Sequence, residues 1–373
     1  MRPQTSCVAL HCPVDLSQLT PSPLVSILLP NYNYAHYIRQ AIQSVIEQSY
    51  SNWELIVCDD GSTDQSREVI STYVVKDRRI SLLTQNNGGQ ASALNAAYAA
   101  SHGEIICILD ADDTFDSTKV ASVVKRFQHQ CDAGLLVHAM TLVDASGTPL
   151  HRIPVLGTFE EGWIGEKVLR RGGRWRYMPS SGLAFRRELG PLGFPIPTSR
   201  FVEGAEGFLF TLFPLFTRIT CLEEELSAYR IHGHNMGGRL GIDARAARKG
   251  ALLMTTVVEG VNARLQEMNY PNLLDVEKNL HISLEMLIAH LLEGEPRIEL
   301  YKRYFSTTRA IFTDDLYTLR QKLFLPMVFG VSTVLPLRFR KWWLDMSNSS
   351  GKRTAARIFA AARRPIRLSA NCS

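Results

Sequence analysis

The chain lacks a long apolar run. Its longest, residues 323–337, spans 15 residues and is interrupted by Pro326, Gly330 and Pro336, whereas a helix needs roughly 20 apolar residues to cross a bilayer. The N-terminal segment is rich in Pro, Ser and Thr and lacks the apolar core of a signal peptide. We therefore expect a loose leader over residues 1–23, no membrane-spanning helix and a cytoplasmic location.

Paired cysteines are also lacking. None of the seven cysteines forms a C-x-x-C pair and several lie in apolar runs, which indicates small core side chains, a reducing compartment and no zinc site. The net charge of +5 is uneven, because residues 337–368 hold nine Lys and Arg against one acid. That segment carries +8 and leaves −3 for the rest (5 − 8), so we expect no nucleic acid partner.

Short apolar runs alternate with helical patterns over the first third of the chain. The runs lie at 24–29, 54–58, 80–83, 104–109 and 134–138. Between them, apolar residues recur at helical spacing in 38–46 and 120–127. Ser62, with Gln65 three residues later, predicts a capping box at the start of another helix. The alternation is typical of βαβ units and predicts an α/β fold with a Rossmann-like, mostly parallel sheet flanked by helices.

The pattern of strand and helix signals along the sequence changes twice. Loops rich in Gly, Arg and aromatic residues begin near residue 139, and helical patterns dominate from residue 240. We expect a catalytic domain over 24–238, with a nucleotide-binding half (24–138) and an acceptor half (139–238), followed by a helical C-terminal extension (239–373).

Two acidic clusters each follow an apolar run. They are Asp59 with Asp60, and the Asp-Ala-Asp-Asp sequence of residues 110–113. Ligands bind beyond the carboxyl ends of parallel strands, where gathered carboxylates repel one another unless a cation compensates. Oxygen ligands of this kind suit Mg²⁺ or Mn²⁺ bridging phosphates. Each cluster alone is also explained by a helix cap or a turn, but the two together favour a metal site.

Three stretches carry a recognisable pattern: VSILLPNYNYAHYIRQAIQSVIEQSYSNWELIVCDDGSTDQS (25–66), NNGGQASALNAA (86–97) and GEIICILDADD (103–113). Through them the chain closely resembles the family 2 glycosyltransferases, which have the GT-A fold and mostly invert the anomeric centre. The resemblance extends over residues 24–238. It implies transfer of a sugar from a UDP- or dTDP-sugar donor to a glycan or lipid-linked acceptor in the synthesis of cell-envelope polysaccharide.

The resemblance also implies donor contacts. The donor-binding residues would be Pro30, Asn31, Tyr32, Asn33, Asp59, Asp60, Asn87, Gly88, Gln90, Asp110, Ala111 and Asp112. Among them, Tyr32 would stack on uracil and Asp60 would accept a hydrogen bond from the base or ribose, while Asn95 would hold the 87–90 loop. The alternative for Tyr32 is packing against the sheet.

The metal ligands implied by the resemblance are the DxD pair and a histidine. Asp112 would bind Mn²⁺ or Mg²⁺ directly, Asp110 would reach the ribose or donor sugar as well as the metal, and the metal would stabilise the leaving diphosphate. His232, in a Tyr-Arg-x-His segment, would be a third ligand, with a purely structural histidine as the alternative. Arg230 in the same segment would meet phosphate.

Inversion needs a base that takes the proton of the acceptor hydroxyl. The family usually supplies an Asp near the start of a helix; here Glu206 stands at that place, and Glu203 is the second candidate. Because the side chain departs from the family pattern, an inactive nucleotide-sugar-binding protein stays open as an alternative. A nucleotidyltransferase of related fold is another, although such enzymes typically have a Gly-rich basic loop where this chain has residues 30–33.

Residues 323–368 combine many bases with the aromatic pair Trp342 and Trp343, a combination that favours a bilayer interface. We expect peripheral contact with anionic lipid at the inner face of the cytoplasmic membrane, which would fit a lipid-linked acceptor. The alternative is a solvated basic helix packed on the catalytic domain.

Overall fold

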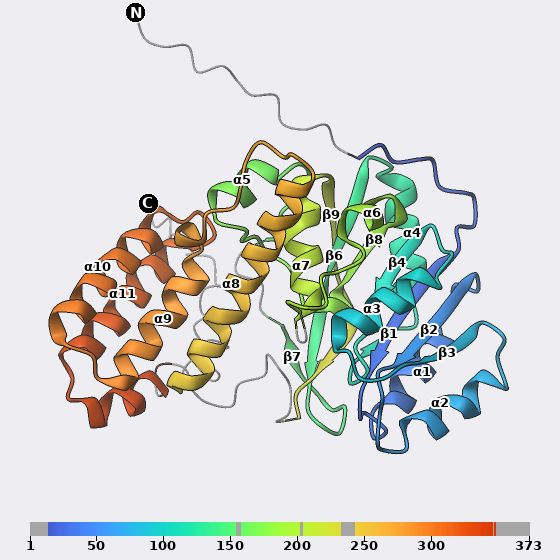
Figure 1. Cartoon of the computed structure of the whole chain (residues 1–373), viewed down its shortest axis with the longest axis horizontal. Coiled ribbons are helices and arrows are strands. Elements are labelled where there is room, and N and C mark those ends of the chain that lie inside the picture. Colours follow the sequence, from blue (N-terminus) through green and yellow to red (C-terminus); the bar gives the residue numbers. More distant parts are fainter. Residues whose placement is uncertain (1–13, 154–157, 202–203, 233–242, 346, 348–373) are drawn as a thin grey trace, which may run out of the picture. The chain divides into compact units, whose positions relative to one another are not determined.

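The computed structural model describes residues 14–153, 158–201, 204–232, 243–345 and 347 (Figure 1). The chain divides into two compact units, Met1–Gly238 with Leu253–Asn279 and Arg239–Leu252 with Leu280–Ser373. Among the described residues, no helix has both the length and the hydropathy that crossing a bilayer requires. The domain boundary expected after residue 238 stays a prediction.

In the described part of the first unit, nine strands form one sheet in the order β3-β2-β1-β4-β8-β6-β9-β5, with β7 paired to β6. They are β1 (Val25–Asn31), β2 (Trp53–Asp59), β3 (Ile80–Thr84), β4 (Ile105–Ile108), β5 (Thr114–Phe115), β6 (Ala133–Val143), β7 (Pro149–Arg152), β8 (Leu183–Arg186) and β9 (Arg218–Arg230). Strands β1 to β4 pair in parallel, whereas β8 runs antiparallel to β4 and β6. The predicted α/β fold is confirmed. Its sheet is mixed, with one parallel part formed by β1 to β4 and a further parallel pair formed by β6 and β9.

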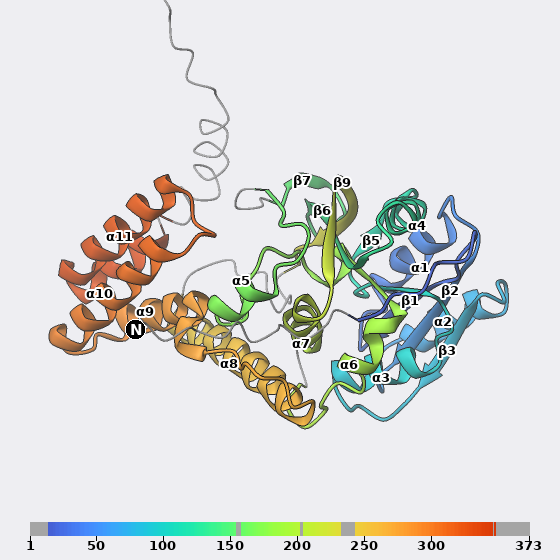
Figure 2. The same cartoon turned by 90° about the horizontal axis from the view of Figure 1, so that it is seen from above.

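Helices cover both faces of this sheet. They are α1 (Ile38–Ile46), α2 (Ser66–Val74), α3 (Gln90–Ala99), α4 (Lys119–His129), α5 (Gly165–Arg170), α6 (Gly190–Gly193) and α7 (Ala205–Leu212). Figure 2 shows α1 and α4 on one side of β1 and α3 on the other. Because successive strand residues face opposite sides, Ile27 and Leu29 pack with α1 and α4, while Leu28 packs with α3 and α7. Both faces are therefore buried, which explains the unbroken apolar runs.

The cysteines in these strands behave as predicted. Cys58 in β2 and Cys107 in β4 are free and fully buried. They fill the core as small apolar side chains.

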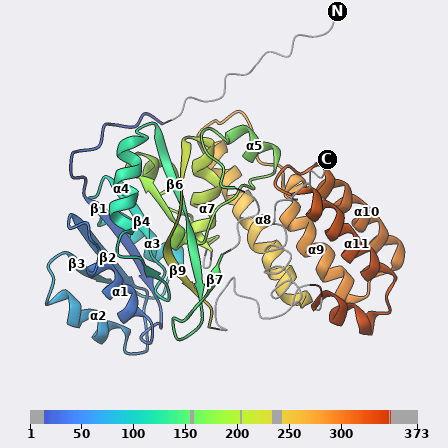
Figure 3. The ribbon, with the colours of Figure 1, turned by 180° about the vertical axis from the view of Figure 1, so that it is seen from behind.

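The second unit is helical. Its helices α9 (Leu280–Glu293), α10 (Arg297–Thr313) and α11 (Leu319–Val334) pack side by side (Figure 3), and the long helix α8 (Ala244–Glu267) contributes residues to both units. The core of the second unit contains Leu287, Leu291, Leu300, Val328, Phe329 and Leu344. The predicted helical C-terminal region is thus confirmed.

Candidate active site

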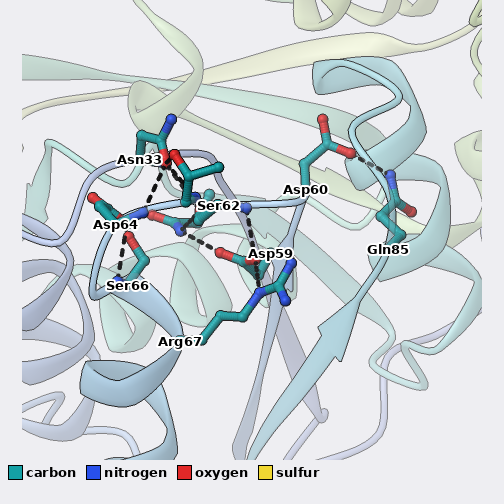
Figure 4. A network of polar contacts seen from close by, with 10 residues as sticks. Asn33, Asp59, Asp60, Ser62, Asp64, Ser66, Arg67 and Gln85 are labelled. Atoms are coloured by element: carbon teal, nitrogen blue, oxygen red, sulfur yellow. Dashed lines mark hydrogen bonds and ion pairs between the residues drawn. The ribbon is translucent and has the colours of Figure 1, made fainter.

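The residues that follow β1 and β2 lie at the same edge of the sheet and are joined by Asp59. Its Oδ2 accepts a hydrogen bond from Asn31 Nδ2 at 2.8 Å. Its Oδ1 accepts from the Ser62 backbone at 3.0 Å and from Arg67 Nε at 2.6 Å; Figure 4 labels Asp59, Ser62 and Arg67. Burial alone would raise the pKa of Asp59, but the hydrogen bonds from Ser62, Arg67 and Asn31 outweigh it and lower the pKa. Asp59 therefore organises the two loops as a carboxylate; its role as a donor contact stays a prediction.

The hydroxyl of Ser62 is engaged by the loop after β1. Ser62 Oγ accepts from Asn31 Nδ2 at 3.1 Å and from the Asn33 backbone at 2.9 Å. Helix α2 begins at Ser66, and its N-cap residue Gln65 makes no side-chain capping bond. The predicted capping box is therefore wrong, because a tertiary contact has captured the serine that the local pattern assigned to the helix.

Tyr32 lies at an exposed position of the same loop. Its side chain is 44% exposed, so the alternative in which it packs against the sheet does not hold. Pro30 and Asn31 end β1, and Asn33 has a φ of 60°, a left-handed conformation that asparagine tolerates. The loop expected to hold a nucleobase thus leaves an aromatic ring accessible for stacking.

Asp60 holds the loop after β3. Its Oδ1 accepts from Gln85 Nε2 at 2.6 Å and from the Gly88 backbone at 2.9 Å, and its Oδ2 accepts from the Gly89 backbone at 2.8 Å. Figure 4 shows Asp60 directed toward Gln85 and Asp59 toward Arg67. Gly89 has a φ of 84°, which favours glycine. Together with Asn87, Gly88 presents an exposed loop that a donor can approach.

Two polar residues of α3 contact the segment around α7. Gln90 Oε1 accepts from the Ala205 backbone at 3.1 Å. Asn95 accepts from the Ile196 backbone N–H at 2.7 Å and donates to its carbonyl at 2.9 Å. Asn95 therefore ties α3 to residue 196 and not to the 87–90 loop, contrary to our prediction.

The acidic loop after β4 is held by two serines of a 3-10 turn, Ser180–Gly182. The Asp110 backbone donates to Ser181 Oγ at 3.1 Å, and Ser180 Oγ donates to Asp110 Oδ2. Ala111 is buried in this loop. The sequence showed these serines only as small loop residues, and their function in fixing Asp110 depends on the pairing of β8 with β4.

The carboxyl groups of the site raise one another's pKa. Burial first, then Glu206 and Asp112, raises the pKa of Asp110 to about 8. Burial, followed by Asp112 and Asp110, also raises the pKa of Asp113. The described residues hold no preassembled group of three or more His, Cys, Asp or Glu side chains around a metal position. The set nevertheless fits a divalent cation, because oxygen ligands that repel one another gain most from such a charge.

The structure brings His232 to Asp112. His232 Nε2 lies 2.8 Å from Asp112 Oδ2, and its ring stacks on Tyr37 with the centroids 4.9 Å apart. Tyr34 meets the same ring edge-on at 5.9 Å. Neither tyrosine was predicted, because nothing local in the 34–37 stretch indicates a partner nearly two hundred residues later in the chain.

Arg230 holds the acidic loop through hydrogen bonds from its side chain and its backbone. Its side chain is buried, and it donates from Nε to the Asp112 carbonyl at 2.8 Å and from a terminal nitrogen to Gln40 Oε1 at 2.6 Å. Its backbone N–H donates to Asp113 Oδ1 at 3.0 Å. The expected contact with phosphate would require the guanidinium to leave these partners.

Glu206 lies in the first turn of α7, after Gly204 with a φ of 70°. Burial raises its pKa, and within the described residues its buried Oε2 has no hydrogen-bond partner. Its charge contributes to the raised pKa of Asp110, which indicates that these two carboxyl groups lie near one another; its role as the base stays a prediction. Glu203 lies outside the described residues.

Lys119 was not predicted, yet it lies fully buried below this site. Its Nζ donates to the Ser181 carbonyl at 2.7 Å and to Ser227 Oγ at 3.3 Å, and it lies 3.4 Å from the centroid of the Phe115 ring. Burial lowers the pKa of Lys119 to about 7. The lysine thereby supports the serine turn that holds Asp110.

Comparisons with known proteins agree with this arrangement of the site residues. The family described as "Glycosyl transferase family 2" matches residues 26–190, and an uncharacterized glycosyltransferase of Nostoc sp. is 32% identical over 313 residues, covering 79% of this chain and 96% of that relative. This chain belongs to glycosyltransferase family 2. The chain is therefore a glycosyltransferase enzyme, as predicted.

Further relatives extend the comparison. The Escherichia coli enzyme UDP-Glc:alpha-D-GlcNAc-diphosphoundecaprenol beta-1,3-glucosyltransferase WfgD is 44% identical over 98 residues, 26% of this chain and 38% of the relative. The crystal structure of S. aureus TarS 1-349 in complex with UDP-GlcNAc has a TM-score of 0.51 at 15% identity, covering 88% of this chain and 92% of that one. The structural likeness confirms the GT-A fold.

Proposed function

We propose that this family 2 glycosyltransferase moves a sugar from a nucleotide-diphosphate sugar, UDP- or dTDP-linked, to a hydroxyl of a glycan or lipid-linked acceptor, with inversion. The observation that carries the proposal is the cluster of Asp110, Asp112 and Glu206, in which Glu206 and Asp112 help raise the pKa of Asp110 to about 8. The relative WfgD, which uses UDP-Glc and a diphosphoundecaprenol acceptor, and TarS, solved in complex with UDP-GlcNAc, support the donor and acceptor classes.

The donor would be recognised by the loop after β1 and the loop after β3, which Asp59 and Asp60 keep in place through hydrogen bonds. The exposed ring of Tyr32 would stack on the base, and the exposed backbone around Gly88 would approach the nucleoside. In this proposal Asp59 acts on the donor through Asn31, because its oxygens already accept the hydrogen bonds of the surrounding loop.

We infer that Asp110, Asp112 and His232 would hold a divalent cation, Mn²⁺ or Mg²⁺. Two carboxylates and an imidazole form a donor set that such ions accept. When bound, the cation would offset the negative charge that develops on the leaving diphosphate. Ser180 and Ser181 would keep Asp110 oriented for this task through the hydrogen bonds described above.

Glu206 would act as the base. Its carboxylate would take the proton of the acceptor hydroxyl while the hydroxyl oxygen forms a bond to the anomeric carbon. The bond from that carbon to the diphosphate oxygen breaks, and the diphosphate leaves with the electron pair. The raised pKa of Glu206 suits a base that works near neutral pH. Glu203 stays the second candidate.

Donor hydrolysis over a panel of nucleotide sugars, with Mn²⁺, Mg²⁺ or EDTA, tests the metal proposal. We expect metal-dependent release of a nucleoside diphosphate by the wild type, and its loss in Asp112→Asn. Asp132→Asn is the matched control, because this aspartate is exposed and forms a surface ion pair with the exposed Arg218. Full activity in EDTA, or in Asp112→Asn, would reject the metal site.

The variant Glu206→Gln tests the base. We expect the transfer rate to fall about 100- to 10,000-fold, the usual contribution of general base catalysis, while calorimetric binding of UDP with Mn²⁺ is kept. An unchanged rate would reject Glu206. Release of pyrophosphate instead of a nucleoside diphosphate would identify a nucleotidyltransferase, and binding with no turnover of any donor and acceptor would identify an inactive binding protein.

A further inference from the structure

The exposed side of α11 is apolar. Because a helix turns once in 3.6 residues, four of its exposed side chains fall within an arc of about 80°. Two of them, Leu319 and Leu323, are 71% and 58% exposed, while Val328 and Phe329 on another side of the helix fill the core of the second unit. The four are Leu319, Leu323, Met327 and Val334. A helix that is apolar on its core side and on its exposed side is unusual in water.

A second stripe runs along α10. Its exposed members occur at every third or fourth position, so they share one side of the helix. Phe305, at its centre, is 65% exposed. The stripe consists of Ile298, Lys302, Phe305, Arg309 and Phe312. Lys322 Nζ donates to the Phe312 carbonyl at 2.8 Å, which brings the end of α10 next to the start of α11.

Exposed charges around these stripes are mostly positive. Over residues 297–345 the structure has seven exposed bases and two exposed acids, a balance of +5 (7 − 2). They are Arg297, Lys302, Arg303, Arg309, Arg320, Arg338 and Lys341 against Glu299 and Asp315. Lys302 pairs with Glu299 at 2.8 Å on the surface, which reduces its charge only weakly. In the helical residues 337–345, the exposed Trp342 and Phe339 lie among the bases.

We propose that the α10–α11 face docks on the surface of an anionic phospholipid bilayer. This face is defined as Ile298, Phe305, Phe312, Leu319, Leu323, Met327, Val334, Phe339 and Trp342 with the seven bases above. Apolar and aromatic side chains enter the boundary between headgroups and acyl chains, and each nearby base gains from the negative lipid surface.

The positive charge of the face favours an anionic bilayer, and not a second copy of the chain, as its binding partner. A two-fold contact between copies would bring two faces of +5 together, and like charges across an interface are strongly unfavourable. The sequence predicted lipid contact through residues 323–368. Residue 346 and residues 348–368 lie outside the described residues. The structure adds α10, for which no lipid contact was predicted. The inference does not rest on the proposed donor chemistry.

Vesicle binding by the full chain tests the proposal. We would compare vesicles of phosphatidylcholine alone with vesicles of phosphatidylcholine and phosphatidylglycerol in equal parts, by co-sedimentation. Wild type is expected to bind the anionic vesicles more tightly, and the double variant Leu323→Ser, Met327→Ser to bind them at least about tenfold more weakly. Leu150→Ser is the matched control, because Leu150 is 53% exposed but lies in the first unit. Cooperative thermal unfolding of each variant checks that it folds.

Two further measurements distinguish the contribution of the basic side chains to vesicle binding from that of the apolar side chains that enter the bilayer. Arg309→Glu with Arg320→Glu is expected to weaken binding about tenfold or more and to reduce its salt dependence. Lipids with brominated acyl chains are expected to quench the wild-type tryptophan emission more than that of Trp342→Phe. The proposal is overturned if binding ignores lipid charge, if the double serine variant binds like wild type, or if light scattering shows a dimer that this variant dissociates. Nucleotide binding is measured separately, so either result stands without the other.

Discussion

Replacing Asp59 by asparagine should reveal how strongly the donor loops depend on one buried carboxylate. Three hydrogen bonds reach its two oxygens, from Asn31, Ser62 and Arg67. An asparagine fits the same space but exchanges one oxygen for an NH₂ group. Since a donor faces each of the two oxygen positions, either orientation of the amide sets a donor against a donor.

The cost follows from the partners that are lost. A buried polar group without a partner costs about 1–3 kcal/mol. Arg67 is 43% exposed, so its ion pair adds only about 0.5 kcal/mol. Asn31 keeps its second hydrogen bond, to Ser62 Oγ at 3.1 Å, which limits the loss. We expect Asp59→Asn to lower the free energy of unfolding by about 2–3 kcal/mol and to weaken the binding of UDP with Mn²⁺.

Urea denaturation measures this difference, and pH supplies an internal check. Because the folded-state pKa of Asp59 is lowered, its contribution is present above the ordinary aspartate pKa and is lost as the pH falls through the folded-state value. The gap between wild type and Asp59→Asn should therefore narrow in acid. Asp132→Asn, at the surface, should change stability by less than about 0.5 kcal/mol. A gap below that size, or one constant with pH, would refute the reasoning.

Three other predictions address single residues. Gly89→Ala should cost about 1–2 kcal/mol of stability in urea, because its φ of 84° is strained for alanine; an unchanged midpoint would contradict the requirement for glycine. Tyr32→Ala should weaken calorimetric binding of UDP by about 5- to 100-fold through lost stacking, whereas Tyr32→Phe should not; equal affinities would remove Tyr32 from the donor site. Because the pKa of Glu206 is raised, kcat/KM should fall with decreasing pH above the ordinary glutamate range, and the residual rate of Glu206→Gln should lack this decline.

Local sequence patterns were sufficient for strands β1 to β4 and for helices α1 and α4, whereas α3 and the short strand β5 were not predicted. An unbroken apolar run predicts a strand that is buried on both faces, and a three- to four-residue apolar spacing predicts a helix that is buried on one face, so β1 and α1 follow from the sequence. The return of β8 between β4 and β6 did not follow, because pairing between distant strands leaves no local pattern. Ser62 failed for a related reason: its capping signal was correct locally, but Asn31 and Asn33 compete for the same hydroxyl.

The acidic residues of the site could be predicted from the sequence, whereas the residues that position them and stabilise their charge could not. Asp110 and Asp112 follow an apolar run, and the ends of parallel strands meet at one edge of the sheet. What holds Asp110 there is Ser180 and Ser181, and what holds Ser181 is the ammonium group of Lys119. In the sequence Lys119 resembles any lysine at the start of a helix. Only the structure shows that Lys119 is fully buried, that its Nζ donates to the Ser181 carbonyl, and that its charge acts to lower the pKa of Asp110 against the larger effect of burial. Buried charges that compensate one another in this way are chosen by tertiary structure, so they are the part of a site that sequence patterns reveal least.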